Sequence, residues 1–392
     1  FIEDIVSYMI TNESCTFQYY SNFMRNHPVM DKNIRDDTQI SRLLKYNIKE
    51  EDINLFLRAW NQMNNTKECI YVGYDSTNFN TNAYGIELAD YGHPKVDEGL
   101  PQYNLAYAVN QKDSTPLFYE LYDGSVIDNT ELEIMLEEAK EYGHEKLGVL
   151  MDRGYISEKN IKALRTKGYE YILMMKQNQR ICQEIIEEYG AAVQSLEGYY
   201  IGEHGVYGTT VKKQLYGQET NIHVYYDDIR ASEEKVALMS RYETWEKEIE
   251  KKVAKRIATE GEMKKYRKVF KLKYDQNGYL VAYQRNSRYI KEEIRNLGFF
   301  FIITSEEMSA SKALDIYRGR DNIEKMFRSL KSGIDFNKAR VHTTESLKSK
   351  VFVTFIAMIV RNELFQKAEE LRKKNRKAYT VPGMISELEN IE

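Results

Sequence analysis

The order of strand-like and helix-like segments limits the fold more than any other feature of this sequence. Three consecutive runs are rich in β-branched and aromatic residues and are punctuated by Gly, Pro or Asn; they cover 69–77, 103–111 and 115–124. Two capped helix patterns then alternate with two apolar strand patterns, in the order 130–143, 147–151, 157–168 and 169–176. The order β-β-β-α-β-α-β predicts an α/β fold built around a mixed sheet with flanking helices.

The segments on either side of this core have different patterns. The amino-terminal part reads as short helices, including 38–46 and 50–62. Such a pair is either a DNA-reading unit or a packing element. Because the chain begins with Phe1 and not with methionine, we expect this part to be a truncated DNA-binding region.

A large insertion separates the core from its last elements. Residues 177–297 contain a first helix, two Gly/Tyr-rich strand regions at 199–208 and 221–228, and a highly charged helix-like run to 273. An apolar strand at 298–305, a long helix from Ser309 or Ser311 to about 332, and a helical tail at 346–376 follow. The predicted division is a helical segment at 1–64, the first core part at 65–176, a β-rich insertion subdomain at 177–297, the second core part at 298–345 and a tail at 346–392.

Charge is unevenly distributed along the 392 residues. The net charge of −4 and the pI near 6.0 argue against a protein that coats nucleic acid through bulk charge. Residues 251–273 nevertheless contain ten Lys or Arg against two Glu, a balance of +8, which leaves −12 for the rest of the chain. This segment is either a phosphate-contacting patch or a solvated helix face.

Several classes of protein are excluded by what the sequence lacks. The longest apolar run, 355–360, is far shorter than the roughly 20 residues that span a bilayer, and no secretory signal is visible. We therefore expect a cytoplasmic protein with no membrane partner. Three widely spaced cysteines and six scattered histidines suggest neither a disulfide framework nor a zinc site.

Two aspartates stand where predicted strands end. Asp75 and Asp152 each follow an apolar run, and ligands of open α/β sheets bind at the carboxyl ends of strands. A carboxylate next to a buried strand is costly to desolvate unless a cation meets it. Each aspartate alone is equally consistent with a turn or a helix cap, but the pair favours a shared site.

The stretch 317–331 supplies a third carboxylate. With 100° per residue along one helix, the side chains of Tyr317, Arg320, Glu324 and Lys331 fall within an arc of about 60°, next to a buried stripe. Glu324 is then expected at the rim of the core. The alternative is an ion-paired helix edge that contributes little to stability.

These residues carry a family resemblance. The chain resembles bacterial insertion-sequence transposases of the DDE class, in the subgroup marked by Tyr, two residues, Arg, three residues, Glu, six residues and Lys. Tyr317, Arg320, Glu324 and Lys331 match that spacing without a gap, and 75-DST-77, 152-DRGY-155 and 99-GLPQYNLAYAV-109 extend the similarity over roughly 64–365. The resemblance implies an RNase H-like fold with a β-rich insertion before the catalytic glutamate.

The resemblance also implies a site and its chemistry. Asp75, Asp152 and Glu324 would be the catalytic acids and would hold two divalent metal ions. Two carboxylates about 4 Å apart repel by about 4 kcal/mol at an effective dielectric of 20, so three converging acids require bound cations. Oxygen ligands without clustered His or Cys point to Mg²⁺ or Mn²⁺.

Other residues of this subgroup would contact DNA. By resemblance, Arg320 and Lys331 would hold phosphates at the transposon end and Tyr317 would help to position that DNA, while Arg153 either joins them or is a surface arginine. Related transposases stack an aromatic side chain on a flipped base, but the surroundings of Trp245 favour a core tryptophan.

The predicted function is therefore DNA transposition. We expect a transposase that cleaves and joins double-stranded DNA at terminal inverted repeats and in target DNA, acting as a homodimer. Two alternatives stay open at this point: a non-catalytic DNA-binding remnant and a general RNase H-like nuclease.

Overall fold

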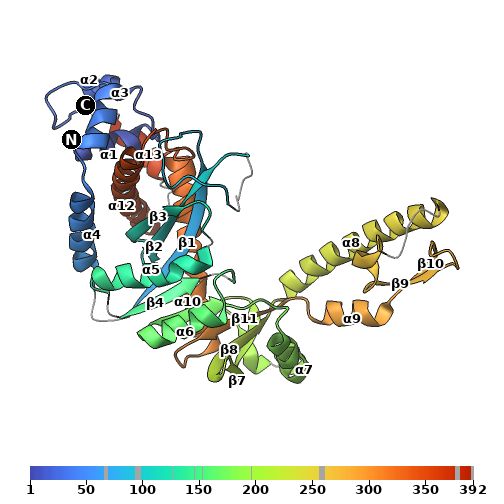
Figure 1. The fold of residues 1–392 in the computed structure, drawn as a ribbon. Helices are drawn as coiled ribbons and strands as arrows, with labels where there is room; N and C mark the ends of the chain where they lie inside the picture. Colours follow the sequence, from blue (N-terminus) through green and yellow to red (C-terminus); the bar gives the residue numbers. More distant parts are fainter. Residues whose placement is uncertain are drawn as a thin grey trace. The chain divides into compact units, whose positions relative to one another are not determined.

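The computed structural model describes residues 1–65, 69–92, 99–126, 128–144, 146–151, 153–195, 197–255, 261–375 and 380–389 (Figure 1). The chain divides into two compact units. The first combines residues 1–173 with 314–392, and the second covers 174–313.

The first unit is a mixed sheet with helices. Its strands are β1 (Ile70–Asn80), β2 (Gln102–Asn110), β3 (Pro116–Asp123), β4 (Leu147–Met151) and β5 (Glu170–Met174), which ends at the unit boundary. Its helices are α1 (Ile2–Thr11), α2 (Tyr20–Asn26), α3 (Asp37–Tyr46), α4 (Glu50–Asn64), α5 (Asp128–Glu141), α6 (Glu158–Lys167), α11 (Asp321–Arg328), α12 (Thr344–Asn375) and α13 (Val381–Glu389).

The strand order of this sheet is β3-β2-β1-β4-β5. The pairs β3–β2 and β2–β1 are antiparallel, whereas β1–β4 and β4–β5 are parallel. Three antiparallel strands followed by two parallel ones form the predicted RNase H-like mixed sheet, and the expected order of strands and helices is confirmed. Because β2 and β4 are buried along nearly their whole length, helices must cover both faces.

Alternation along the strands decides which helix covers which face. On β2, the Tyr107 ring contacts Phe327 of α11 and Phe355 of α12. On β3, Phe118 points to the opposite face and contacts Tyr142, just after α5. Each buried aromatic ring of this kind contributes about 1.5–3 kcal/mol through burial, so the sheet is held from both sides.

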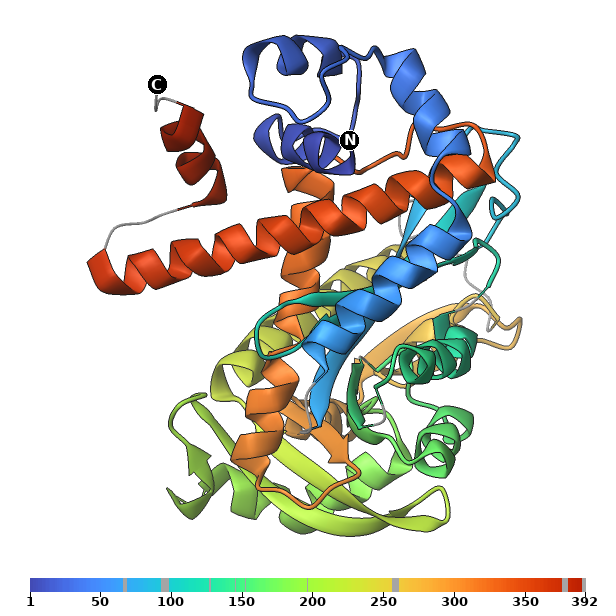
Figure 2. The same cartoon turned by 90° about the vertical axis from the view of Figure 1, so that its left-hand side faces the viewer.

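The amino-terminal helices pack against the long α12, which Figure 2 shows from its side. An Asp36 capping box begins α3, with the Asp36 side chain accepting a hydrogen bond from the Gln39 backbone N–H. In α4, Phe56 contacts Phe352 of α12, and the Trp60 indole donates a 2.7 Å hydrogen bond to the Pro116 carbonyl. These contacts give α4 a packing role in the first unit.

The second unit contains a row of antiparallel strands and a helical extension. The antiparallel order is β11-β8-β7-β6, and β9 and β10 form a separate hairpin. Its elements are α7 (Arg180–Ser195), β6 (Tyr200–Ile201), β7 (Val206–Leu215), β8 (Gln218–Tyr226), α8 (Asp228–Lys255), β9 (Phe270–Tyr274), β10 (Leu280–Arg285), α9 (Ser287–Arg295) and β11 (Phe299–Thr304); α10 (Ala310–Arg318) crosses the unit boundary.

One prediction about the insertion is wrong. The charged run does not continue as a helix to 273, because α8 ends at Lys255 and β9 begins at Phe270. Phe270 is buried and Leu272 partly buried, while Lys271 and Lys273 are exposed, so the lysines conceal a strand with a period of two. Trp245 packs against the core of this extension beside Tyr266, as expected of a core tryptophan.

Two expectations about excluded classes can be compared with the described residues. Within them, no helix is both long and apolar enough to cross a membrane. The three cysteines are free, and Cys15 and Cys182 are buried.

Candidate active site

The candidate site is built on one face of β1. Because side chains alternate along a strand, the odd-numbered residues from 73 to 79 share the face that α11 covers. A Cβ on Gly73 would stand 3.6 Å from that of Ile323, so the strand approaches α11 closely here. Asp75 and Thr77 follow on the same face, where they meet the residues at the two ends of α11. The expectation that Asp75 ends its strand is wrong, because β1 continues to Asn80.

Arg320 links two of the predicted acids. Its Nη2 lies 3.9 Å from Asp75 Oδ2, and its Nη1 lies 3.3 Å from Glu324 Oε1. The side chains of Arg320 and Asp75 are only 17% and 20% exposed, whereas that of Glu324 is 52% exposed. One guanidinium therefore contacts carboxylates that are far apart in sequence, and the Asp75 charge is compensated where it leaves water.

The strand supports this arrangement from its other face. Tyr74 precedes Asp75, points the opposite way and donates a 2.5 Å hydrogen bond to Glu120 on β3. Burial raises the pKa of the Tyr74 phenol well above its ordinary value, and the nearby Glu120 carboxylate raises it further. The hydroxyl therefore keeps its proton, and the bond fixes β1 beneath the site.

The expected single helix from 309 to 332 is wrong. The chain forms α10, a break at Gly319 and Arg320, and then α11, with Arg320 as the residue that precedes the helix. A Cβ on Gly319 would overlap the Gln111 side chain, and Asn322 donates a 2.8 Å hydrogen bond to the Gln111 carbonyl. The turn that presents Arg320 thus lies close to Gln111, directly after β2.

A π-helical turn at Ser329–Gly333 follows α11 and carries Lys331. The Lys331 ammonium donates a 2.8 Å hydrogen bond to Thr77 Oγ1 and lies 5.5 Å from the centroid of the Phe79 ring. Such turns add one residue to a helix and occur often at functional sites. Here the turn directs Lys331 back to the strand that carries Asp75.

The guanidinium of Arg361 in α12 fixes the π-turn. Its Nε donates a 2.9 Å hydrogen bond to Ser329 Oγ, and its Nη2 lies 2.9 Å from Glu13 Oε1. A Cβ on Gly333 would overlap the same guanidinium, so only glycine permits this approach.

The remaining predicted residues are placed differently. Tyr317 lies in α10, before the break, and is only 7% exposed. The expectation that it shares one edge of a single straight helix with Arg320, Glu324 and Lys331 is therefore wrong. Arg153 is exposed after β4. Asp152 lies outside the described residues; β4 ends at Met151, and its Leu150 pairs with Gly73 of β1.

A comparison with protein families shows to which family the chain belongs. The family described as "Transposase DDE domain" matches residues 72–360. The chain belongs to the transposase DDE domain family. The resemblance noted from the sequence is thereby confirmed at the level of the family. No curated protein matches the sequence.

Solved transposase structures are also similar to this family member. One is the piggyBac transposase synaptic complex with hairpin DNA, at 8% identity and a TM-score of 0.42 over 94% of this chain and 61% of that one. Another is the Drosophila P element transposase strand transfer complex, at 11% identity and a TM-score of 0.27 over 98% and 83%. A third is the Mos1 transposase paired-end complex with the left transposon end, at 15% and 0.20 over 44% and 57%. The chain thus spans 61% of the piggyBac chain.

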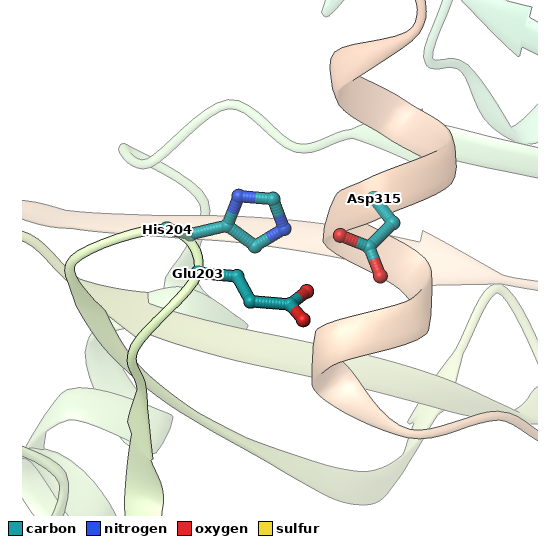
Figure 3. A group of neighbouring side chains, drawn as sticks. All are labelled: Glu203, His204 and Asp315. Atoms are coloured by element: carbon teal, nitrogen blue, oxygen red, sulfur yellow. The ribbon is translucent and has the colours of Figure 1, made fainter.

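The donor chemistry of this candidate site suits a hard divalent cation. Asp75 and Glu324 offer carboxylate oxygens next to one arginine, and such oxygens are the ligands that Mg²⁺ and Mn²⁺ prefer. A second group of potential ligands is drawn in Figure 3, with Glu203 and His204 in the turn after β6 and Asp315 on α10. These residues come from different units, and we assign no site to them.

Several residues of the candidate site were not predicted from the sequence. Thr77 was noted only as part of a motif, yet its alternation with Asp75 on a strand already places it on the same face. Gln111 and Arg361 carried no sequence signal, because their roles depend on contacts between distant segments.

Proposed function

We propose that this protein is a DNA transposase of the Tyr-Arg-Glu-Lys subgroup, which cleaves DNA strands at transposon ends and transfers them to target DNA. The observation that carries the proposal is the Arg320 guanidinium next to both Asp75 and Glu324. Membership of the transposase DDE domain family supports it. Asp152, outside the described residues, would complete the set of acids.

Asp75, Asp152 and Glu324 would hold two Mg²⁺ or Mn²⁺ ions. When bound, such ions polarise the scissile phosphate, lower the pKa of the attacking water or 3′-hydroxyl, and stabilise the leaving oxygen. Asp75 would be the rigid ligand, since it is mostly buried on a central strand, while the half-exposed Glu324 can adjust on its helix.

The basic residues would bind and orient the DNA. Arg320 and Lys331 would contact backbone phosphates on either side of the acids, with Lys331 positioned by Thr77. Arg153 is exposed and available for a further phosphate contact. Tyr317 is buried on α10 and would help to position the DNA through the residues around it. We further propose that two copies act together on a pair of terminal inverted repeats, with 177–297 as an insertion subdomain and 1–64 as part of the DNA-binding region.

A cleavage assay tests this function. The full chain is incubated with duplexes that carry the inverted repeats flanking its coding region, with and without Mg²⁺ or Mn²⁺. We expect metal-dependent cleavage that falls by at least about 100-fold in Asp75→Asn and in Glu324→Gln. Glu363→Gln, an exposed carboxylate on α12, is the matched control and should cleave as the parent does.

The other functions give different results in the same assay. Equal cutting of random and terminal-repeat duplexes would identify a general nuclease. Binding of DNA without any cleavage, together with no Mn²⁺ binding that depends on Asp75, would identify a non-catalytic remnant. Cleavage by Glu324→Gln at the parental rate would remove that residue from the catalytic set.

A further inference from the structure

A cavity of about 320 Å³ lies in the first unit, away from the acids of β1 and α11. It is formed by α3, by the segment that precedes α12, and by the first turns of α12. Four cationic side chains line it, namely Arg42, Lys45, Arg340 and Lys350, and no aspartate or glutamate is among the described residues of its wall. A cavity with four cations and no acid attracts an anion.

Lys350 gives the strongest indication of an anionic ligand. Its residue is only 2% exposed, and its ammonium donates a 2.5 Å hydrogen bond to the Ala339 carbonyl and lies 5.1 Å from the centroid of the Phe17 ring. Within the described part of the chain, no carboxylate forms an ion pair with it. A buried ammonium without a counter-ion is costly, and a bound anion would offset that cost.

The other three cations come from separate segments that meet at the cavity. Arg42 and Lys45 are three residues apart on α3 and so lie on one side of that helix. Arg340 has a φ of 54°, in the left-handed region that costs a non-glycine residue about 1–2 kcal/mol. Its guanidinium lies 3.4 Å from Asp335, which leaves further donors of its planar group for a ligand.

Neutral donors complete the wall. Hydroxyl groups of Thr38, Ser41, Thr343 and Ser346 line the cavity along with the cations. The start of α12 at Thr344 adds the positive end of a long helix dipole. Several hydroxyl and guanidinium donors around a concave site match the three or more acceptor oxygens of a phosphate better than the two of a carboxylate.

We propose that this cavity binds a phosphate group. The phosphate group could belong to the backbone of bound DNA, and this choice of ligand rests on the proposed function. The other ligand with the same chemistry is free inorganic phosphate. The site is distinct from the acids around Asp75, so it would anchor DNA without taking part in the chemistry.

Two measurements on the full chain test the proposal. The first is the affinity for duplex DNA at several salt concentrations, without divalent metal. The double variant Arg42→Gln/Arg340→Gln changes two exposed side chains, so folding should be unaffected. We expect its affinity to fall by about tenfold and the slope of log K against log salt to decrease by about one. The second is a calorimetric titration with inorganic phosphate.

Lys348→Gln is the matched control for both measurements. The Lys348→Gln variant removes one cation from α12, outside the wall of the cavity; the Lys348 side chain is 39% exposed and pairs with Glu50 at 3.0 Å. It should bind DNA and phosphate as the parent does.

The outcomes separate the two proposals. Parental DNA binding by the double variant, with no phosphate binding by the parent, overturns the cavity and leaves the transposase assignment intact. Phosphate binding that the double variant loses, in a parent that does not bind DNA, supports the cavity with free phosphate as its ligand and overturns the proposed function. Failure of the parent to bind either probe overturns both.

Discussion

Lys331 donates a 2.8 Å hydrogen bond to Thr77, two residues beyond Asp75 on the same face of β1. This bond joins the π-turn after α11 to the strand that carries the first acid. Thr77 is buried, so the bond is protected from water and holds the ammonium in a defined position. The pair therefore sets where a phosphate contacted by Lys331 would lie.

Thr77→Val should weaken the binding of transposon-end DNA, and this effect should depend entirely on Lys331. The valine keeps the shape of threonine but removes the acceptor, and we expect a loss of about threefold to tenfold in affinity. In a Lys331→Met background the same change should have no further effect, because the partner is already absent. Fluorescence anisotropy of the two single variants and the double variant measures this coupling. Thr77→Ser retains the hydroxyl as a control, and additive losses would contradict the positioning role.

Arg320→Met should have opposite effects on metal and on DNA. Without the guanidinium, the charges of Asp75 and Glu324 are no longer compensated by it, and the repulsion between guanidinium and metal disappears. We expect Mn²⁺ affinity without DNA to rise by about tenfold, and DNA cleavage to fall by at least about 100-fold. Calorimetry and the cleavage assay provide the two readings. Lys325→Met, which removes an exposed cation of α11, should change neither.

Gly319→Ala should destabilise the first unit because the new methyl group overlaps the Gln111 side chain. Overpacking of this kind costs about 1–3 kcal/mol. Gln111→Ala removes the obstructing atoms, so the double variant should recover most of the loss in urea unfolding. If Gly319→Ala is as stable as the parent, the close approach to β2 is not what requires glycine before Arg320.

The helices and strands that local sequence patterns determine could be predicted from the sequence. The three strand runs, the two capped helices and the buried strand that ends at Met151 all follow from side-chain periods of 2 and 3.6. The alternation that puts Asp75 on a buried face is equally local. Burial of one face of a segment is enough to determine whether it forms a helix or a strand. The segments that pack against it did not have to be known.

The parts that were wrong depend on contacts between distant segments. The break before α11 lies against Gln111, which is distant in the sequence. The π-turn is held by a hydrogen bond from Arg361 of α12. A helical wheel assumes one straight axis, so it could not place Tyr317 and Lys331 relative to each other. In β9, Lys271 and Lys273 alternate with the residues that face the core, so the strand period was hidden within the charged run.

His144 should make the first unit less stable in acid. It is buried, its Nε2 lies 2.7 Å from Asn61 Oδ1, and burial lowers its pKa to about 4 from the ordinary value of 6.5. Between these values the unfolded chain binds a proton that the folded chain does not, so stability is present above pH 6.5 and is lost as the pH falls towards 4. We expect a loss of about 3 kcal/mol from this residue.

His144→Gln is the variant that isolates this contribution. Its amide can still donate to Asn61, but it does not titrate. Urea unfolding at pH 7 and pH 4.5 should show a smaller difference for this variant than for the parent. An identical pH dependence in both proteins would show that His144 titrates alike in the folded and unfolded chain.

Lys350→Met should raise the stability of the free protein at neutral pH while reducing phosphate binding. Burial lowers the pKa of the Lys350 ammonium from its ordinary value of 10.5. The folded chain bears the cost of burying the ammonium, whereas the ammonium of the unfolded chain is in water. Replacement of buried charges by apolar side chains of similar size is often stabilising, by about 1–4 kcal/mol.

The pH dependence distinguishes a buried charge from a simple packing effect. The folded chain loses the Lys350 proton at a lower pH than the unfolded chain, whose pKa is about 10.5. Between these two pKa values the stability of the parent therefore rises with pH relative to that of Lys350→Met. The advantage of the variant should therefore shrink between neutral pH and pH 10 in urea unfolding. A constant difference would mean that the methionine acts through packing alone. Saturating inorganic phosphate should also reduce the advantage at pH 7, since the anion stabilises only the parent.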